Sequence, residues 1–318
     1  MIIWISFLFL IFCFLALDLG VLNKKDHVIK TREAALWTSL WVSIALGFSF
    51  VVYWLFSSEF ITNPTQLSPY QAVMKYITGY LIELSLSIDN VFVIAIIFKA
   101  FGIPAIYQHR VLFWGILGAI VFRASMILFG ITLINQFEWI IYLFGAFLIY
   151  TAYKMFRSEN IEYDPKNSFV FKQVKKIYPL TTQIHGNKFF MKRMGLNAAT
   201  PLFVALIVIE ITDILFAFDS IPAILAITAD PFLVFSSNIM AILGLRSMYF
   251  LVSRMLAKFR YIHYSLAVIL GFVGVKMLSA HYWHIEEWVS LSVIIVSLAA
   301  GIAASLLIPE KKEDSPMA

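Results

Sequence analysis

The sequence predicts an all-α membrane protein that crosses the bilayer about nine times. Of its 318 residues, 61% are hydrophobic and only 14% are charged, whereas soluble domains carry about 25% charged residues. The mean hydropathy is +0.86. Apolar runs of about 18–25 residues, the length that crosses a bilayer as a helix, recur along the whole chain. Its single cysteine, Cys13, can form no internal disulfide.

Nine apolar runs are expected to form the membrane helices. In chain order they cover residues 2–22, 34–56, 70–98, 110–134, 138–156, 198–226, 233–255, 261–279 and 286–308. No Lys or Arg precedes the first run, and Lys24 and Lys25 follow it, so a helix is expected there rather than a cleavable signal. The third and sixth runs are the longest and are expected to tilt or break.

The charges between the runs predict the orientation of the chain. Lys and Arg gather in the connections at 23–33, 99–110, 157–197 and 254–260 and after residue 308. The alternate connections carry acidic residues and almost no Lys or Arg. Because basic loops remain in the cytoplasm, the N-terminus is expected outside and the C-terminus inside. The net charge of +5 therefore reflects topology, and no nucleic-acid partner is expected.

Two three-helix segments of the sequence resemble each other. Without a gap, Phe137, Ile140, Tyr142, Leu148, Lys154 and Met155 match Phe259, Ile262, Tyr264, Leu270, Lys276 and Met277. Upstream, Arg123 matches Arg246. Since each copy has an odd number of spans, the copies are expected in opposite orientations, the inverted-repeat plan of many secondary transporters. Chance similarity among apolar helices is the alternative.

These repeats predict how the single transmembrane domain is organised. The expected parts are two N-terminal helices at 1–69, repeat 1 at 70–156, a cytoplasmic loop at 157–197, repeat 2 at 198–280, and a last helix with its tail at 281–318.

Acidic side chains lie inside two of the apolar runs. The segment GYLIELSLSIDNVFV contains Glu83, Asp89 and Asn90, and the segment VIEITDILFAFDSIPAI contains Glu210, Asp213, Asp219 and Ser220. A charge near the bilayer centre costs about 2.5–3.5 kcal/mol even on the lenient scale, so a bound cation or a proton relay is expected to compensate. At about 1.5 Å per residue, Asp89 lies about 9 Å inward of Glu83, and Asp219 about 9 Å outward of Asp213. The sequence therefore predicts a row of acids at successive depths.

The donor atoms of these side chains are all oxygens, which Mg²⁺, Ca²⁺ and Mn²⁺ prefer. Pro222 should leave the backbone carbonyl of Phe218 without a donor, and a broken helix there would offer a further ligand; an ordinary kink is the alternative. Arg123 and Arg246 lie near span centres and are expected either to pair with the acids of the empty site or to form purely structural ion pairs. Asp18 is a candidate for one more acid near the cytoplasmic side.

Other polar residues are expected to have ordinary roles. Lys154 and Lys276 lie near span ends and are expected to extend toward the interface. His281 and His284, beside two glutamates, are expected in a solvated loop rather than a metal-collecting cluster. A folding network is the alternative for the buried acids, but five acids against two arginines leave negative charge unpaired.

The two acidic motifs resemble those of the TerC family of integral membrane proteins, and of its Alx-type manganese exporters in particular. The segments ITADPF at 227–232 and ILGLRSMYFL at 242–251 are also similar, and the likeness covers nearly the whole chain. By residue, the family's acidic motifs fall here on Glu83, Asp89, Asn90, Asp213, Asp219 and Ser220. The resemblance implies a protein of the bacterial inner membrane that exports metal ions, chiefly Mn²⁺.

The leading hypothesis is therefore a Mn²⁺ exporter that works by alternating access and exchanges the metal for protons, with no permanently bound cofactor and no enzymatic activity. Transport of Ca²⁺ or Mg²⁺ is an alternative. Another is a membrane-protein assembly or insertion factor, for which residues 157–197 would be a docking surface. An intramembrane aspartyl protease is disfavoured because the YD…GxGD context is missing around Asp89 and Asp219. Direct ATP drive is disfavoured because no GxxxxGK[ST] motif occurs.

Overall fold

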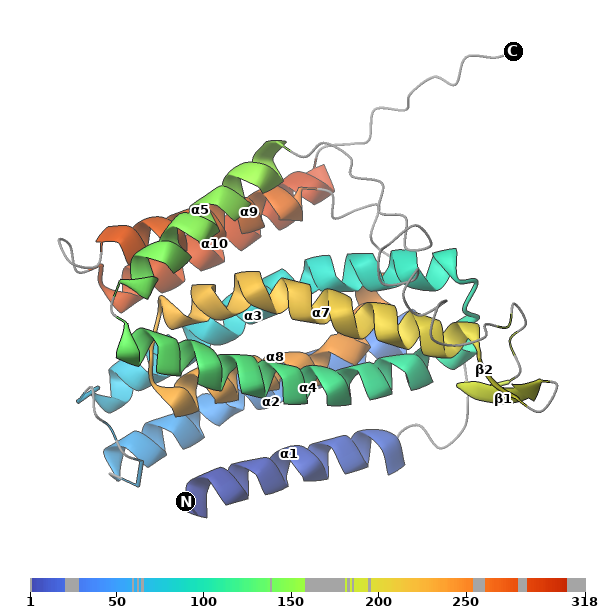
Figure 1. Ribbon diagram of the computed structural model, residues 1–318. Coiled ribbons are helices and arrows are strands. Elements are labelled where there is room, and N and C mark those ends of the chain that lie inside the picture. The colour runs from blue at the N-terminus through green and yellow to red at the C-terminus, as the bar shows by residue number, and fades with distance from the viewer. Residues whose placement is uncertain are drawn as a thin grey trace, which may run out of the picture.

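The helices of the computed structural model form one bundle in which successive helices run in alternating directions (Figure 1), and most of the extensive contacts join helices that are not successive in the chain. The structure describes residues 2–20, 29–58, 60–61, 63, 66–137, 139–157, 181, 184, 186–193, 196–253, 261–279 and 285–307. The helices are α1 (Ile2–Gly20), α2 (Thr31–Ser57), α3 (Pro69–Ala100), α4 (Ala105–Gln136), α5 (Ile140–Arg157), α7 (Pro201–Leu225), α8 (Pro231–Val252), α9 (Ile262–Ser279) and α10 (Glu287–Leu307). Within the described residues, eight helices are long and apolar enough to cross a membrane, and α1 is a shorter apolar helix over Ile2–Leu17.

Each of the nine predicted runs corresponds to one of these helices, so the all-α membrane fold is confirmed. Two local expectations are wrong. The longest helices are α3 and α4, each with 32 residues, whereas α7 has 25. The helix α4 is longer than its apolar run because it also includes polar residues such as Gln108 and His109 near its start.

The helix α7 is also not broken at Pro222. It continues through Pro222 to Leu225, and the N–H of Ala226 donates to the carbonyl of Pro222 at 3.0 Å. A proline in the last turn of a helix removes only one backbone hydrogen bond, and the chain turns soon afterwards, so little distortion is required.

A short β-hairpin precedes α7 within the stretch predicted as a cytoplasmic loop. Strand β1 (Phe190–Arg193) pairs antiparallel with β2 (Leu196–Ala199). The hydroxyl of Thr200 donates to the carbonyl of Lys188 at 2.8 Å and so ties the hairpin to the start of α7. Most of the 157–197 connection lies outside the described residues.

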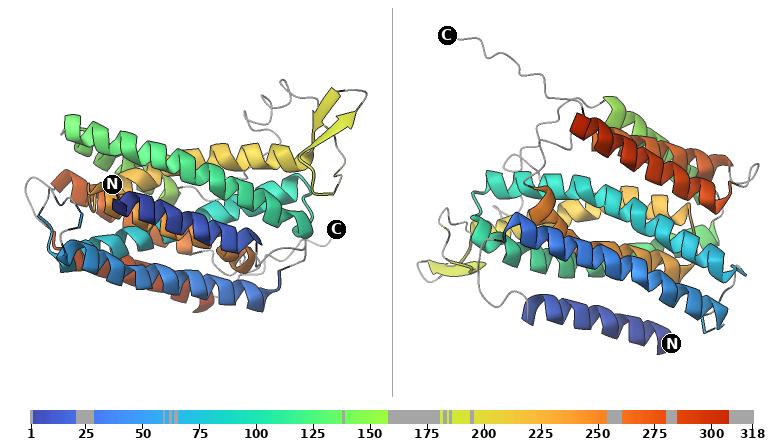
Figure 2. Two further views of the ribbon diagram at one scale, coloured as in Figure 1. Left: turned by 90° about the horizontal axis from the view of Figure 1, so that it is seen from below. Right: turned by 180° about the vertical axis from the view of Figure 1, so that it is seen from behind.

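The helices are arranged in groups around α8. Over its membrane-spanning window α8 is 94% buried, and it packs against α2, α3 and α4. The helices α5, α9 and α10 form a group on one side of α3 and α7, and α1 lies on the opposite side of the bundle (Figures 1 and 2).

The packing partners follow the predicted repeat. In the predicted repeat, α3 corresponds to α7, α4 to α8 and α5 to α9. The contact between α3 and α8 therefore corresponds to the contact between α7 and α4, and both contacts are extensive. The contact of α5 with α7 likewise corresponds to that of α9 with α3, which is also present. This correspondence supports an inverted repeat, which stays a prediction.

The two helices α5 and α9 approach each other closely through glycines. A Cβ atom added to Gly274 of α9 would lie 2.9 Å from the carbonyl oxygen of Gly145 and 2.8 Å from Cγ1 of Ile149, both on α5. Neither the helix backbone nor a side chain packed between two helices can move away easily. Small residues are how membrane helices achieve such contact.

We expect Gly274→Ala to lower the free energy of unfolding by about 1–3 kcal/mol, because the added methyl group forces α5 and α9 apart. The matched control is Gly47→Ala on α2, where the new Cβ would meet no atom within 4 Å. Unfolding in detergent, followed by circular dichroism, measures both. If Gly274→Ala is as stable as Gly47→Ala, the close contact between α5 and α9 is wrong.

Candidate functional site

A buried arginine joins the two acidic motifs. Arg123 of α4 is 1% exposed and forms ion pairs with Glu83 of α3 and Asp213 of α7. Its Nε donates to Oδ2 of Asp213 at 3.1 Å and its Nη2 to Oδ1 at 2.8 Å, while Nη1 donates to Oε1 of Glu83. The planar guanidinium therefore binds one carboxylate with two parallel bonds and a second carboxylate with the remaining nitrogen.

Amide and hydroxyl side chains complete this arrangement. Asn238 of α8 donates to Oε2 of Glu83 at 2.9 Å, and Asn90 of α3 donates to Oδ1 of Asp213 at 3.5 Å. Arg123 also donates to Oγ of Ser220 at 3.5 Å. We call these residues the central cluster: Glu83, Asn90, Arg123, Asp213, Ser220 and Asn238. The predicted pairing of Arg123 with carboxylates is therefore present, and it connects α3, α4, α7 and α8.

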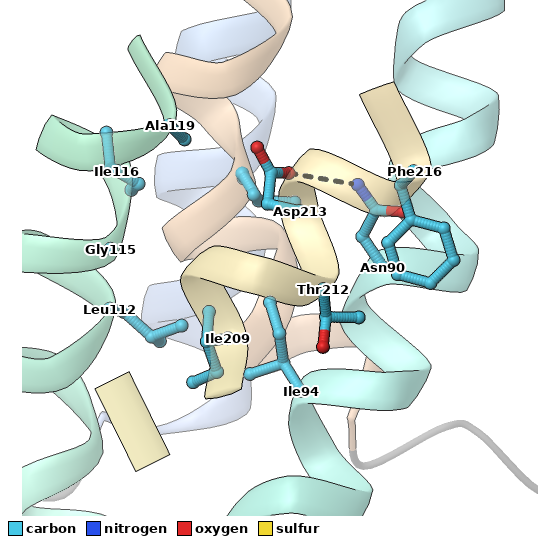
Figure 3. A pocket seen from close by; sticks show the side chains of 11 residues that line it. Asn90, Ile94, Leu112, Gly115, Ile116, Ala119, Ile209, Thr212, Asp213 and Phe216 are labelled. Atoms are coloured by element: carbon cyan, nitrogen blue, oxygen red, sulfur yellow. Dashed lines mark hydrogen bonds between the residues drawn. The ribbon is translucent and has the colours of Figure 1, made fainter. Parts of the chain in front are cut away.

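A small cavity lies beside the central cluster, between α3, α4, α7 and α8 (Figure 3). Asn90 and Asp213 point toward each other at its edge, and most of the lining is apolar, including Ile94 and Ile209. Its volume of about 30 Å³ is enough for about two water molecules. Water therefore has room beside Asp213.

A larger cavity lies on the other face of α3 and α7. It has a volume of about 320 Å³ and is bounded by α3, α5, α7 and α9. Its lining residues are Leu86, Asp89, Asn90, Thr151, Lys154, Met155, Phe216, Asp219, Ser220, His263 and Leu270. The hydroxyl of Thr151 on α5 donates to Oδ1 of Asp219 at 3.1 Å. We call this space the acidic cavity, because Asp89 and Asp219 both line it.

Four of the acids thus fall into two groups, Glu83 with Asp213 in the central cluster and Asp89 with Asp219 at the acidic cavity, and their order by depth stays a prediction. Asp89 lies six positions after Glu83, and Asp219 lies six positions after Asp213. At about 100° per residue, a spacing of six turns the second acid to a different face of the helix. Asn90 and Ser220 are seven residues from the central acids, so they share the face of the central cluster and also border the acidic cavity.

Glu210 joins neither group of lining residues. Its carboxylate lies directly against Gly118 of α4, at a place that a Cβ atom of residue 118 would occupy. Within the described residues its Oε2 is buried without a hydrogen-bond partner. The predicted accessory residues are also dispersed: the side chain of Phe218 is 54% exposed, and that of Asp18 lies outside the described residues, as do His281 and His284.

Arg246 has surroundings different from those of its repeat partner Arg123. It is buried in α8, where its Nη1 lies 3.2 Å from Nε2 of His109 on α4. Arg123 is near the middle of the 32-residue α4, whereas Arg246 lies six positions before Val252, the last residue of α8.

An ionic cluster that the sequence did not predict lies at the start of α10. Lys75 of α3 pairs with Glu287 at 2.8 Å and donates to the carbonyl of Ile227 at 2.7 Å. Lys276 of α9 donates to Ser290 at 2.8 Å and lies 3.6 Å from Glu287. The start of α10 therefore supplies Lys276 with a hydrogen-bond acceptor and a counter-charge. Its expected extension toward the membrane interface stays a prediction.

Asp230 lies near this cluster and begins α8. Its Oδ1 accepts hydrogen bonds from the N–H groups of Phe232 and Leu233, both at 3.0 Å. Burial raises the pKa of Asp230 above its ordinary value, although the two backbone hydrogen bonds and Lys75 act in the opposite direction. The aspartate of the ITADPF segment thus has a structural role as a helix cap.

Sequence reasoning missed Asn238 and Thr151. Asn238 had a signal, since it follows Ser236 and Ser237 inside an apolar run, and an amide in such a run needs a buried partner. Thr151 had none, because a threonine in a membrane helix usually donates to its own backbone. Among the described residues, no three His, Cys, Asp or Glu side chains lie together as a metal site. A cation in the acidic cavity would need amide and hydroxyl oxygens besides its two carboxylates.

We expect Arg123→Gln to lower the free energy of unfolding by about 3–5 kcal/mol, because it leaves Glu83 and Asp213 buried without their counter-charge. Unfolding in detergent measures the loss. The triple variant Glu83→Gln/Arg123→Gln/Asp213→Asn removes all three charges and should recover most of it. Arg157→Gln, at the exposed end of α5, is the control. A single variant as stable as this control would contradict the ion pairs.

Comparison with known proteins agrees with the fold and the motifs. The family model described as "Integral membrane protein TerC family" matches residues 68–313. An uncharacterized membrane protein of Myxococcus xanthus is 46% identical over 317 residues, which cover 98% of this chain and 96% of that protein. A "putative membrane-bound redox modulator Alx" of Photorhabdus laumondii is 43% identical over 310 residues, covering 97% and 96%. No solved structure matches. The chain belongs to the TerC family of integral membrane proteins.

Proposed function

We propose that the protein is a transporter that exports a divalent cation, Mn²⁺ first, and that the acidic cavity is its binding site. The observation that carries this proposal is the convergence of Asp89 and Asp219 on one cavity. These are the matching acids of the two motifs, and they come from helices far apart in the sequence. Two carboxylates with neutral oxygens suit Mn²⁺, Mg²⁺ and Ca²⁺. The choice of Mn²⁺ among these ions rests on the resemblance to Alx-type exporters.

The side chains around the two acids supply the remaining donors. Asn90 follows Asp89, Ser220 follows Asp219, and the hydroxyl of Thr151 already reaches Asp219. We assign Glu83 and Asp213 a positioning role instead, since Arg123 already occupies their oxygens. Through Asn90 and Ser220 the central cluster fixes one wall of the site.

Alternating access requires that one wall of the site moves relative to the other. In this protein α3 and α7 form one wall of the acidic cavity, and α5 and α9 form the other. The first pair is tied to α4 and α8 by the central cluster, whereas α5 and α9 pack extensively on each other. We therefore propose that the α5–α9 pair, one helix from each repeat, moves as a unit against the rest, as one helix bundle moves against another in secondary transporters.

The direction of transport sets an energy requirement. The bacterial relatives and the alternation of basic and acidic connections support a cytoplasmic membrane location with the N-terminus outside. Moving two positive charges outward against about 100 mV costs about 4.6 kcal/mol, at about 2.3 kcal/mol per charge. Entry of protons would supply this energy.

We expect wild-type protein in liposomes to carry Mn²⁺ and the Asp89→Asn/Asp219→Asn variant to carry at least about 100-fold less, because the two charges that attract the ion are absent. Fluorescence quenching of a trapped metal indicator measures the flux. Glu286→Gln, which removes an exposed acid outside the cavity, should leave flux unchanged. Equal flux in the wild type and the double variant would reject the site. No flux in any of them, with folding verified, would favour the assembly-factor hypothesis.

Coupling to protons gives a separate expectation. When Mn²⁺ is added to proteoliposomes, an internal pH dye should report a pH change that depends on the protein, and collapse of the pH gradient by an ionophore should slow the flux several-fold. The double variant at Asp89 and Asp219 is the control for leakage. Mn²⁺ flux that is unaffected by the ionophore would exclude proton exchange while leaving the transport proposal intact.

A further inference from the structure

The acidic cavity contains a cation of its own. Lys154, in the last turn of α5, lines the cavity together with Asp89 and Asp219. Its side chain borders the same space as the carboxylate of Asp219. Thr151, one turn earlier on the same face of α5, donates to that carboxylate at 3.1 Å. The helix α5 therefore presents both a hydroxyl and a positive charge to the same acid.

The two carboxylates of the acidic cavity cannot balance the charges of a lysine and a divalent cation at the same time. Asp89 and Asp219 carry two negative charges when ionised, and one divalent cation balances both. An ammonium beside that cation would add a third positive charge in a space of about 320 Å³. The two cations repel each other and compete for the oxygens of Asp219.

Lys154 also differs from the buried cation of the central cluster. Arg123 is 1% exposed and bound by two carboxylates, so its charge is fixed. Lys154 is exposed and carries its ammonium on a flexible four-carbon chain. It can therefore leave the carboxylate without unfolding the helix that carries it.

The matching lysine of the second repeat, Lys276, has partners that Lys154 does not have. Lys276 corresponds to Lys154 in the sequence alignment of α5 and α9. Its ammonium is held by Ser290 and lies near Glu287, both from α10, which is outside the repeat. One lysine of the pair is thus neutralised by an added helix, and the other is accessible from the cavity.

We propose that Lys154 is a tethered counter-cation of the acidic cavity: its ammonium partly neutralises Asp89 and Asp219 when the cavity holds no divalent cation, and a divalent cation must displace it to bind. This proposal rests on the proposed function, and it gives Lys154 a role in specificity. A divalent cation is attracted to the two carboxylates twice as strongly as a monovalent one. It can therefore displace the ammonium where Na⁺ or K⁺ cannot.

The test compares Mn²⁺ binding to purified full-length protein, measured by the loss of the free-ion paramagnetic resonance signal. At about 6 Å in water-like surroundings, repulsion between an ammonium and a divalent cation corresponds to about a tenfold change in Kd. We expect Lys154→Met and Lys154→Gln to bind Mn²⁺ about tenfold more tightly than wild type. Lys154→Arg, which keeps the charge, should bind within about twofold of wild type. Lys99→Met, which removes an exposed lysine outside the cavity, is the matched control.

Competition with Na⁺ gives a second measurement on the same variants. Excess Na⁺ should weaken Mn²⁺ binding more in Lys154→Met than in wild type, since the residue that excludes monovalent ions is absent. An unchanged or weaker affinity in both Lys154→Met and Lys154→Gln would overturn the role of Lys154, provided that wild type binds Mn²⁺. No Mn²⁺ binding by wild type, or equal binding by Asp219→Asn, would instead overturn the proposed site itself and the role of Lys154 with it.

Discussion

The ion pairs of Arg123 with Glu83 and Asp213 are the interaction on which the rest of the structure depends. They join two motifs that are 130 residues apart in the chain, at the place where α3, α4, α7 and α8 meet. Charges buried in a membrane protein are too costly to leave unpaired, so the geometry of the guanidinium determines where α3 and α7 lie relative to each other. The opposite faces of these helices, which carry Asp89 and Asp219, are thereby placed as well.

The rotation of about 100° per residue along a helix then places some polar residues of α3 and α7 in the central cluster and others at the acidic cavity. Acids six residues apart point to different faces, so the first acid of each motif can be neutralised inside the bundle while the second borders a cavity. The polar residues Asn90 and Ser220 lie between the two faces and contact both. A rigid support beside an accessible site is what a transporter needs, because the site must keep its shape while the opposite wall moves.

The sequence alone was sufficient for the helices and the motifs, but not for their partners. Each apolar run became a helix, because backbone groups in a bilayer have no other way to be satisfied. Hydropathy could not show which helix is central. The windows of α8 and α5 have nearly the same hydropathy, yet the first is 94% buried and the second only 22%. The contacts of Asn238, Thr151 and Lys276 join distant segments, and no local pattern encodes them.

The two halves of the predicted repeat are chemically unequal, and this inequality follows from the helix added after them. The start of α10 brings Glu287 and Ser290 to Lys276, so one of the two matching lysines is bound at the end of the bundle. The other, Lys154, remains on the wall of the acidic cavity. A site built from symmetric acids thus receives a single positive charge from one side only. Since α5 carries that charge and also forms the wall proposed to move, movement of α5 would change the separation between Lys154 and Asp219 and, with it, the affinity of the cavity for a cation.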